Sequence, residues 1–210
     1  MKNPEIFFSK AFYKNLKLRI DFLEVLAANK INKDSDLSQE AYILCLCYID
    51  GLASETKATN KKSSKRFIEY LIKYGGNPQF GAIHPLIFWE YLYKSTDKKL
   101  NNLEKSFKPF LKKLPRDGKC FTEEEFIFLI EKSADPVFTE KQKALIKKCL
   151  YHGTIAAKAY EIRCDAVHEI VAGEIHFSRT SFNNVPIKEL SFESMLNALK
   201  NMINIILARF

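Results

Sequence analysis

The chain has 210 residues and a formal net charge of +8, with 47% hydrophobic and 28% charged residues. It contains only seven glycines and seven prolines, which argues against an all-β protein with many tight turns. No apolar run reaches the roughly 18 residues of a membrane span, so no membrane association is expected.

The five cysteines form neither a CxxC motif nor a Cys/His cluster with zinc spacing. The N-terminal residues lack the uninterrupted apolar segment of a signal peptide. We therefore expect reduced thiols, no metal, no other cofactor and a cytoplasmic location.

The first two predicted helices are long. Apolar residues three or four apart between Phe8 and Ala27 predict an amphipathic helix over residues 5–29. Ser38 is expected to cap a second helix, over 38–56, which is apolar on all sides and should be buried. Asp50 interrupts this apolar helix. We favour a hydrogen-bonded core carboxylate here, and a catalytic role is the alternative.

Residues 57–136 are predicted to be an insertion of short helices and loops. Its short helices are expected over 65–74, 85–95 and 122–133, and the last of them opens with a capping box of Thr122 and Glu125. A polar, Lys-rich stretch should separate the second from the third. Trp89 and the neighbouring rings are expected to form the core of the insertion; alternatively, exposed rings beside lysines could stack on bases.

A third long helix is predicted over residues 139–168, and a fourth, capped by Ser191, over 191–209. Between them, alternation at Ile175 and Phe177 is compatible with a short strand. The predicted fold is therefore all-α. We expect one domain, 1–210, in which an up-and-down bundle of four long helices carries the inserted segment.

The positive charge is concentrated in the middle of the chain. Residues 57–119 contain 15 Lys and Arg against 5 Asp and Glu, and the rest of the chain contains 18 against 20. One interpretation is an ordinary solvated surface. The other is a landing site for nucleic acid, for which the candidate residues are Lys61, Lys62, Lys65 and Arg66.

The segment YEIRCDAVHEI contains the best candidates for chemistry, Arg163 and His168. Arg163 lies on the inward stripe of its predicted helix, where an arginine needs an anionic partner, and Asp50 is a candidate for that partner. On an unbroken helix the two residues point about 140° apart. They can act together if the helix loosens near Asp165 or if a second subunit completes the site. A polar histidine at a helix end is the simpler explanation of His168.

The spacing Arg163-x4-His168, near the end of a long helix, resembles the HEPN superfamily of compact helical domains, whose hallmark is Arg, four to six residues, then His. The resemblance covers residues 5–56 and 139–210 and leaves 57–136 unmatched. Cys164 stands where many catalytic members have Asn, Asp or His, and Asp165 follows it.

The resemblance implies metal-independent RNA cleavage, often by toxins or host-defence proteins, at a site shared across a homodimer. His168 would transfer protons and Arg163 would stabilise charge on the phosphate. Asp50, Asp165 and Cys164 are candidate supporting residues, and an antitoxin or another protein is a candidate partner. Two alternatives remain: a non-catalytic HEPN-like domain that binds RNA or nucleotides or acts as a scaffold, and a helical nucleic-acid-binding regulator.

Overall fold

The computed structural model describes residues 10–28, 30–32, 35–55, 62–114, 119–172, 181–182 and 185–210. Its chain is all-α, as predicted, apart from two pairs of very short strands. The chain contacts divide it into two compact units. The first, the bundle unit, comprises Met1–Asn77, Ala159–Thr180 and Lys188–Phe210, and the second, the aromatic unit, comprises Pro78–Lys158 and Ser181–Ile187.

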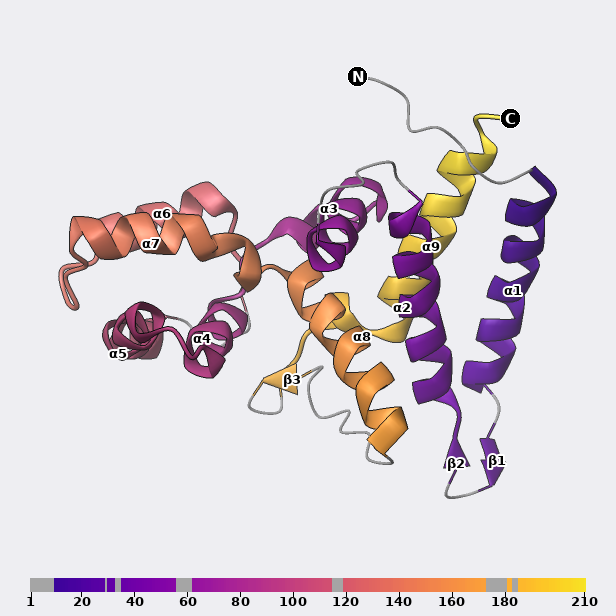
Figure 1. The fold of residues 1–210 in the computed structure, drawn as a ribbon, viewed down its shortest axis with the longest axis horizontal. Helices are drawn as coiled ribbons and strands as arrows, with labels where there is room; N and C mark the ends of the chain where they lie inside the picture. Colours follow the sequence, from indigo (N-terminus) through magenta and orange to yellow (C-terminus); the bar gives the residue numbers. More distant parts are fainter. Residues whose placement is uncertain are drawn as a thin grey trace. The chain divides into compact units, whose positions relative to one another are not determined.

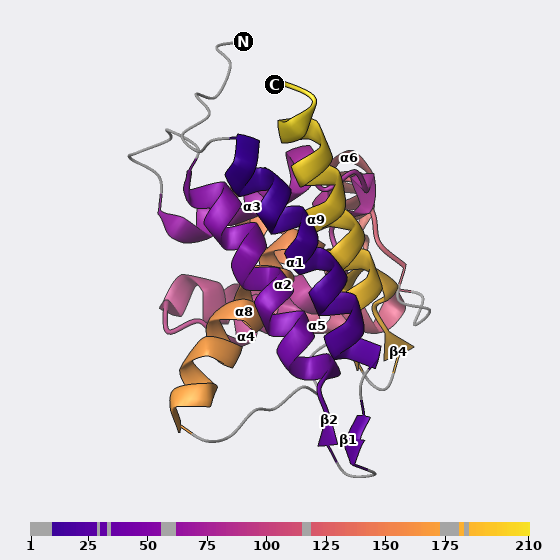
Figure 2. The same cartoon turned by 90° about the vertical axis from the view of Figure 1, so that its right-hand side faces the viewer.

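The bundle unit is built around three packed helices, α1 (Lys10–Ala28), α2 (Ser38–Ser54) and α9 (Phe192–Leu207). Figures 1 and 2 show these helices side by side. The antiparallel strands β1 (Lys30–Asn32) and β2 (Ser35–Asp36) connect α1 to α2. Helix α3 (Ser63–Tyr74) packs on α2 and α9. The core of this unit is mainly aliphatic, with Leu23, Leu46, Ile49, Leu71, Leu199 and Ile203 fully buried.

Several helix boundaries in the bundle unit follow from local chemistry. Ser191 caps α9, as predicted, by accepting a hydrogen bond from the Ser194 amide. Ser38, in contrast, is the first helical residue of α2 and does not cap it. After α3 the chain turns at Gly76, whose φ of 77° suits glycine, and there a Cβ would lie 2.8 Å from the Asn201 side chain.

The aromatic unit contains α4 (Pro85–Lys94), α5 (Lys98–Lys113), α6 (Glu123–Lys132) and α7 (Glu140–Cys149). Single 3-10 turns lie at Pro78–Gly81 and Leu150–Gly153. Strands β3 (Ser181–Phe182) and β4 (Val185–Pro186) form an antiparallel pair, and a further 3-10 turn, Lys188–Leu190 in the bundle unit, precedes α9. Phenylalanines dominate the core of the aromatic unit, namely Phe88, Phe107, Phe110, Phe121, Phe126 and Phe138.

One prediction for this region was wrong. The Lys-rich stretch after α4 is not irregular but forms α5, because Asp97 caps it and its apolar residues recur on one face. The bounds of the aromatic unit do not coincide with the insertion predicted over 57–136, which stays a prediction, because α3 belongs to the bundle unit and α7 to the aromatic unit. The capping box of Thr122 and Glu125 is confirmed at the start of α6.

The single long helix predicted over 139–168 is also wrong, because the chain bends at Gly153 between α7 and α8 (Ile155–Ala172). The Gly153 carbonyl accepts a hydrogen bond from the His84 amide at 2.9 Å, so it leaves the helical pattern. The Thr154 hydroxyl then accepts from the Ala157 amide at 3.1 Å and caps α8. The predicted strand at Ile175 and Phe177 lies outside the described residues.

Candidate functional site

Arg163 and Asp50 form an ion pair in the bundle unit. Arg163 Nη2 on α8 lies 2.7 Å from Asp50 Oδ2 on α2, and the two side chains are only 26% and 19% exposed. Burial is the largest single influence and lowers the pKa of the guanidinium, but the Asp50 carboxylate together with Cys164 and Cys47 outweighs it, so the pKa lies above its usual value. The anionic partner that the inward position of Arg163 requires is therefore Asp50.

The ion pair has polar neighbours on both helices. Cys47 lies one turn before Asp50. Burial has the largest effect on its thiol and raises the pKa, while the nearby guanidinium of Arg163 lowers it by a smaller amount. Tyr160, one turn before Arg163, contacts Cys164, and burial raises the pKa of its phenol. The structure thus gathers Asp50, Arg163 and Cys164 as predicted, and adds Cys47 and Tyr160, which sequence reasoning missed.

Helix α3 reaches the same group of residues. The Tyr160 and Ser63 hydroxyl oxygens lie 2.9 Å apart, and the Tyr160 ring packs on Phe67 with centroids 5.4 Å apart. Ser63 is the first residue of α3, directly after Lys62. We call these residues, Cys47, Asp50, Ser63, Tyr160, Arg163 and Cys164, the Arg163 cluster. The one-turn spacings of Cys47 from Asp50 and of Tyr160 from Arg163 are the sequence signal that could have identified them.

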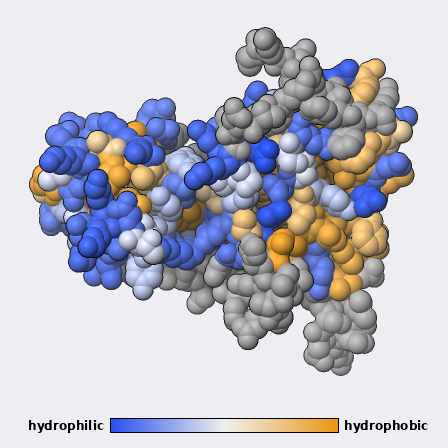
Figure 3. All heavy atoms as spheres, in the orientation of Figure 1, coloured by the Kyte–Doolittle hydropathy of each residue, from blue (hydrophilic) through white to orange (hydrophobic). Residues whose placement is uncertain are grey.

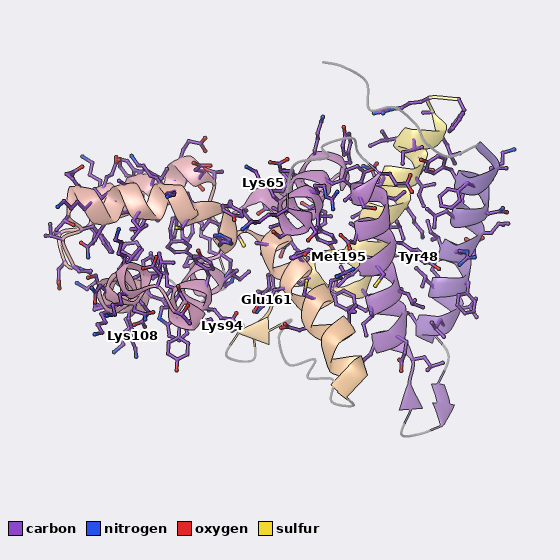
Figure 4. All side chains as sticks on the ribbon, viewed as in Figure 1. Tyr48, Lys65, Lys94, Lys108, Glu161 and Met195 are labelled. Carbon is purple, nitrogen blue, oxygen red and sulfur yellow. The ribbon has the colours of Figure 1, made fainter. Side chains whose placement is uncertain are left out.

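The basic residues predicted to bind nucleic acid lie at the start of α3, except Lys61, which falls outside the described residues. Lys62 and Lys65 are exposed, and Lys65 Nζ lies 4.0 Å from the Glu69 carboxylate (Figure 4). Arg66 is half-buried, and its Nε has no hydrogen-bond partner among the described residues. A positively charged helix start therefore adjoins the Arg163 cluster through Ser63.

The remaining two candidates, His168 and Asp165, do not share the Arg163 face of α8. The helix is continuous from Ile155 to Ala172, so it does not loosen near Asp165, which was one of the two ways in which Arg163 and His168 could act together. At 100° per residue, His168 therefore lies about 140° and Asp165 about 160° around the helix from Arg163. The side chain of His168 is outside the described residues. A site that uses both Arg163 and His168 thus requires two copies of the chain.

The strip of small residues at Gly153–Ala159 does not offer a surface for such a dimer. It is covered within one chain, since Gly153, Ala156 and Ala159 are all buried. A Cβ on Gly153 would lie 2.8 Å from Phe88 Cβ, which shows how closely the turn at Gly153 packs against α4. Homodimerisation itself stays a prediction and would need another face.

His84 and His152 have packing roles. His84 is buried next to α4, and His152 stacks on Tyr91 with ring centroids 4.0 Å apart. Burial lowers the pKa of each imidazole to about 4. His176, which follows the motif, lies outside the described residues.

Three further observations bear on the class of protein. Within the described part of the chain, no three His, Cys, Asp or Glu residues come together as metal ligands. None of the described helices is long and apolar enough to cross a membrane. Comparisons with protein-family models, curated proteins and solved structures found no match to this chain.

Proposed function

We propose that the protein is a metal-independent endoribonuclease of the HEPN type. The observation that carries the proposal is the Arg163–Asp50 ion pair, which holds a half-buried arginine in a polar cluster on the helix that also bears His168. A toxin or defence role, an antitoxin partner and a cytoplasmic location belong to the same proposal.

The Arg163 cluster suits the chemistry of RNA cleavage. RNA supplies its own nucleophile, the 2′-hydroxyl, which forms a bond to phosphorus while the bond from phosphorus to the 5′-oxygen breaks. The products are a 2′,3′-cyclic phosphate and a 5′-hydroxyl. A base must take the 2′-hydroxyl proton and an acid must return one to the 5′-oxygen, and His168 is our candidate for one of these steps. Arg163 stabilises the negative charge on the phosphate.

Arg163 retains donors for a phosphate while it is paired with Asp50. A guanidinium has five N–H groups on three nitrogens. Asp50 contacts Nη2 and Nε is buried, but the side chain as a whole is 26% exposed, so part of the guanidinium can still be reached from solvent. The carboxylate can thus orient the guanidinium while another edge of it binds the substrate.

The continuous helix α8 gives the proposal its geometry. Because Arg163 and His168 are about 140° apart around the helix, each catalytic centre takes Arg163 from one copy and His168 from another. We therefore expect a homodimer in solution. Light scattering that finds a strict monomer in a solution that cleaves RNA would contradict this arrangement.

The alternative, a non-catalytic HEPN-like RNA-binding or scaffold domain, is favoured by one observation. The charge of Arg163 is already balanced by Asp50, as in an ordinary structural ion pair. Under this alternative the cluster stabilises the bundle unit, and His168 has no chemical task.

Incubation of the purified protein with total RNA in EDTA distinguishes the ribonuclease from the non-catalytic alternative. The proposal predicts cleavage with 2′,3′-cyclic phosphate ends, and 2′-deoxy substrates should stay intact because they lack the nucleophile. His168→Ala should lower the rate by about 10²- to 10⁴-fold. Cleavage that persists in His168→Ala would indicate a contaminating nuclease, and the absence of any cleavage by folded dimer would favour the scaffold.

A further inference from the structure

Four lysines of α5 form a stripe along one face of that helix. They are Lys98, Lys105, Lys108 and Lys112, spaced seven, three and four residues apart. At 100° per residue they fall within a sector of about 80°, and they span about 21 Å along the axis. All four are exposed, because the other side of α5 contributes Leu100, Leu103, Phe107 and Phe110 to the core of the aromatic unit.

The charges of this lysine stripe are not neutralised within the described part of the chain. Neighbouring lysines of the aromatic unit do form ion pairs, for example Lys94 with Glu90 and Lys113 with Asp135. No stripe lysine has such a pair among the described residues. In Figure 3 the surface over α4 and α5 is predominantly hydrophilic, and Figure 4 labels Lys108 and Lys94 there. A polyanion would meet four unpaired ammonium groups along one line.

An aromatic pair on α4 adjoins the α5 helix. Trp89 Nε1 donates a 2.8 Å hydrogen bond to Glu104 of α5, and the Trp89 ring stacks on Tyr93 with centroids 5.4 Å apart and an interplanar angle of 28°. Tyr93 nevertheless remains 67% exposed. An aromatic ring supported from one side and open to solvent is a suitable surface for a nucleic-acid base.

We propose that the lysine stripe of α5 and Tyr93 dock single-stranded RNA, with phosphates along the stripe and a base stacked on Tyr93. A single strand offers both features at once, whereas a duplex hides the faces of its bases. An acidic protein would use the lysines but would have no need of the exposed ring. The choice of RNA rests on the proposed ribonuclease function, but the preference for a single strand does not.

The test of the stripe measures binding by fluorescence anisotropy in EDTA. The probes are a labelled oligouridylate of about 15 nucleotides, a length within the site sizes of proteins that bind single strands, and its uncleavable 2′-deoxy counterpart. The stripe variant carries Lys105→Gln, Lys108→Gln and Lys112→Gln. Its matched control carries Lys132→Gln, Lys141→Gln and Lys148→Gln, three exposed lysines on other helices of the same unit.

We expect the stripe variant to flatten the slope of log affinity against log salt by about 2, since each lost contact to a single strand contributes about 0.7. The control should change the slope by less than half as much. Equal changes in the two variants would show that net charge, and not this face, governs binding, and would overturn the proposal.

Tyr93→Ala tests the stacking step. It should weaken binding of the single strand roughly 5- to 150-fold, the range expected for one lost base–aromatic stack, while Tyr93→Phe should retain the affinity. Binding of duplex RNA as tight as that of the single strand would overturn the proposal. The proposal would also be overturned if Tyr93→Ala bound RNA as tightly as the wild type and polyglutamate displaced the RNA. That result would indicate an acidic protein partner.

The failure of this proposal can be distinguished from failure of the ribonuclease proposal. If RNA is bound through the stripe but never cut in EDTA, the docking proposal is supported and the ribonuclease proposal is contradicted. If RNA is cut by a reaction that needs His168, but neither the stripe nor Tyr93 contributes to binding, the ribonuclease proposal is supported and the docking proposal is contradicted.

Discussion

The two units of this protein handle ionisable groups in different ways. In the aromatic unit, Lys158 is 1% exposed and its Nζ lies 2.6 Å from Glu90, and His84 is 2% exposed. In the bundle unit, the Arg163–Asp50 pair is partly exposed and surrounded by hydroxyl and thiol groups. The two pairs differ in the cation, because the Lys158 ammonium is buried and cannot meet a ligand, whereas the Arg163 side chain is 26% exposed and can. The proposed chemistry is therefore assigned to the bundle unit.

The largest expected effect is a loss of stability of the aromatic unit in acid. The pKa values of His84 and His152 are lowered from about 6.5 to about 4 by burial, so between these values the unfolded chain binds protons that the folded chain does not. Stability must therefore fall as the pH falls below 6.5, by about 1.4 kcal/mol per unit for each histidine. From pH 7 to pH 5 we expect a loss of about 4 kcal/mol.

Urea unfolding followed by tryptophan fluorescence measures this loss, because Trp89, the one tryptophan of the chain, belongs to the aromatic unit. The control is His152→Phe, which keeps a ring between Tyr91 and Tyr151 but cannot titrate. It should remove about half of the acid effect. A pH dependence identical to that of the wild type would show that His152 does not contribute.

The next effect concerns the ion pair of the bundle unit. Arg163→Met should lower the free energy of unfolding by about 1–3 kcal/mol, between the values for exposed and fully buried pairs, because it leaves Asp50 partly buried and unpaired. The double variant with Asp50→Asn should lose less than the sum of the two single variants. Urea unfolding followed by circular dichroism gives the four values. Strict additivity would mean that the two side chains do not interact.

Much of the helical fold was predictable because its signals are local. The capping boxes and the apolar stripes need only neighbouring residues, so α2, α6 and α9 were found nearly where they lie. Helix α5 was missed although Asp97 and its apolar spacing were readable, because its many lysines resembled a loop. The break at Gly153 was not readable at all, since it depends on contacts with residues 82–84, some 70 positions away.

The candidate site was predictable in part for the same reason. The inward position of Arg163 pointed to an anionic partner, and Asp50, the carboxylate that interrupts the apolar second helix, was the candidate. The contact between Tyr160 and Ser63 joins residues 97 positions apart, and no sequence pattern in either segment predicts it. The relation of Arg163 to His168 followed from helical geometry once α8 was seen to be continuous.

Substitutions at two glycines, one in each unit, test how tightly each unit is packed, and their expected effects are smaller. Gly153→Ala should destabilise the aromatic unit by about 1–3 kcal/mol, because the added Cβ would meet Phe88 at 2.8 Å. Gly51→Ala, at an exposed position in the last turn of α2, should stabilise the bundle unit by about 0.5–1 kcal/mol, since nothing lies within 4 Å of the added atom and alanine favours the helix. Thermal unfolding of both variants gives the signs. Destabilisation by Gly51→Ala would contradict the open environment of that position.

The smallest expected effect is on RNA binding by the bundle unit, through the basic start of α3. Lys62→Glu with Lys65→Glu should flatten the salt dependence by about 1, less than the stripe variant of α5, because only two exposed lysines are involved and Glu69 already lies near Lys65. The matched control is Lys14→Glu with Lys17→Glu, two exposed lysines of α1. Because Ser63 joins this helix start to Tyr160, the α3 variant should also slow RNA cleavage at low salt, where the control should not. Equal salt slopes for the two variants would assign Lys62 and Lys65 to ordinary solvated surface and leave α5 as the stronger candidate for RNA docking.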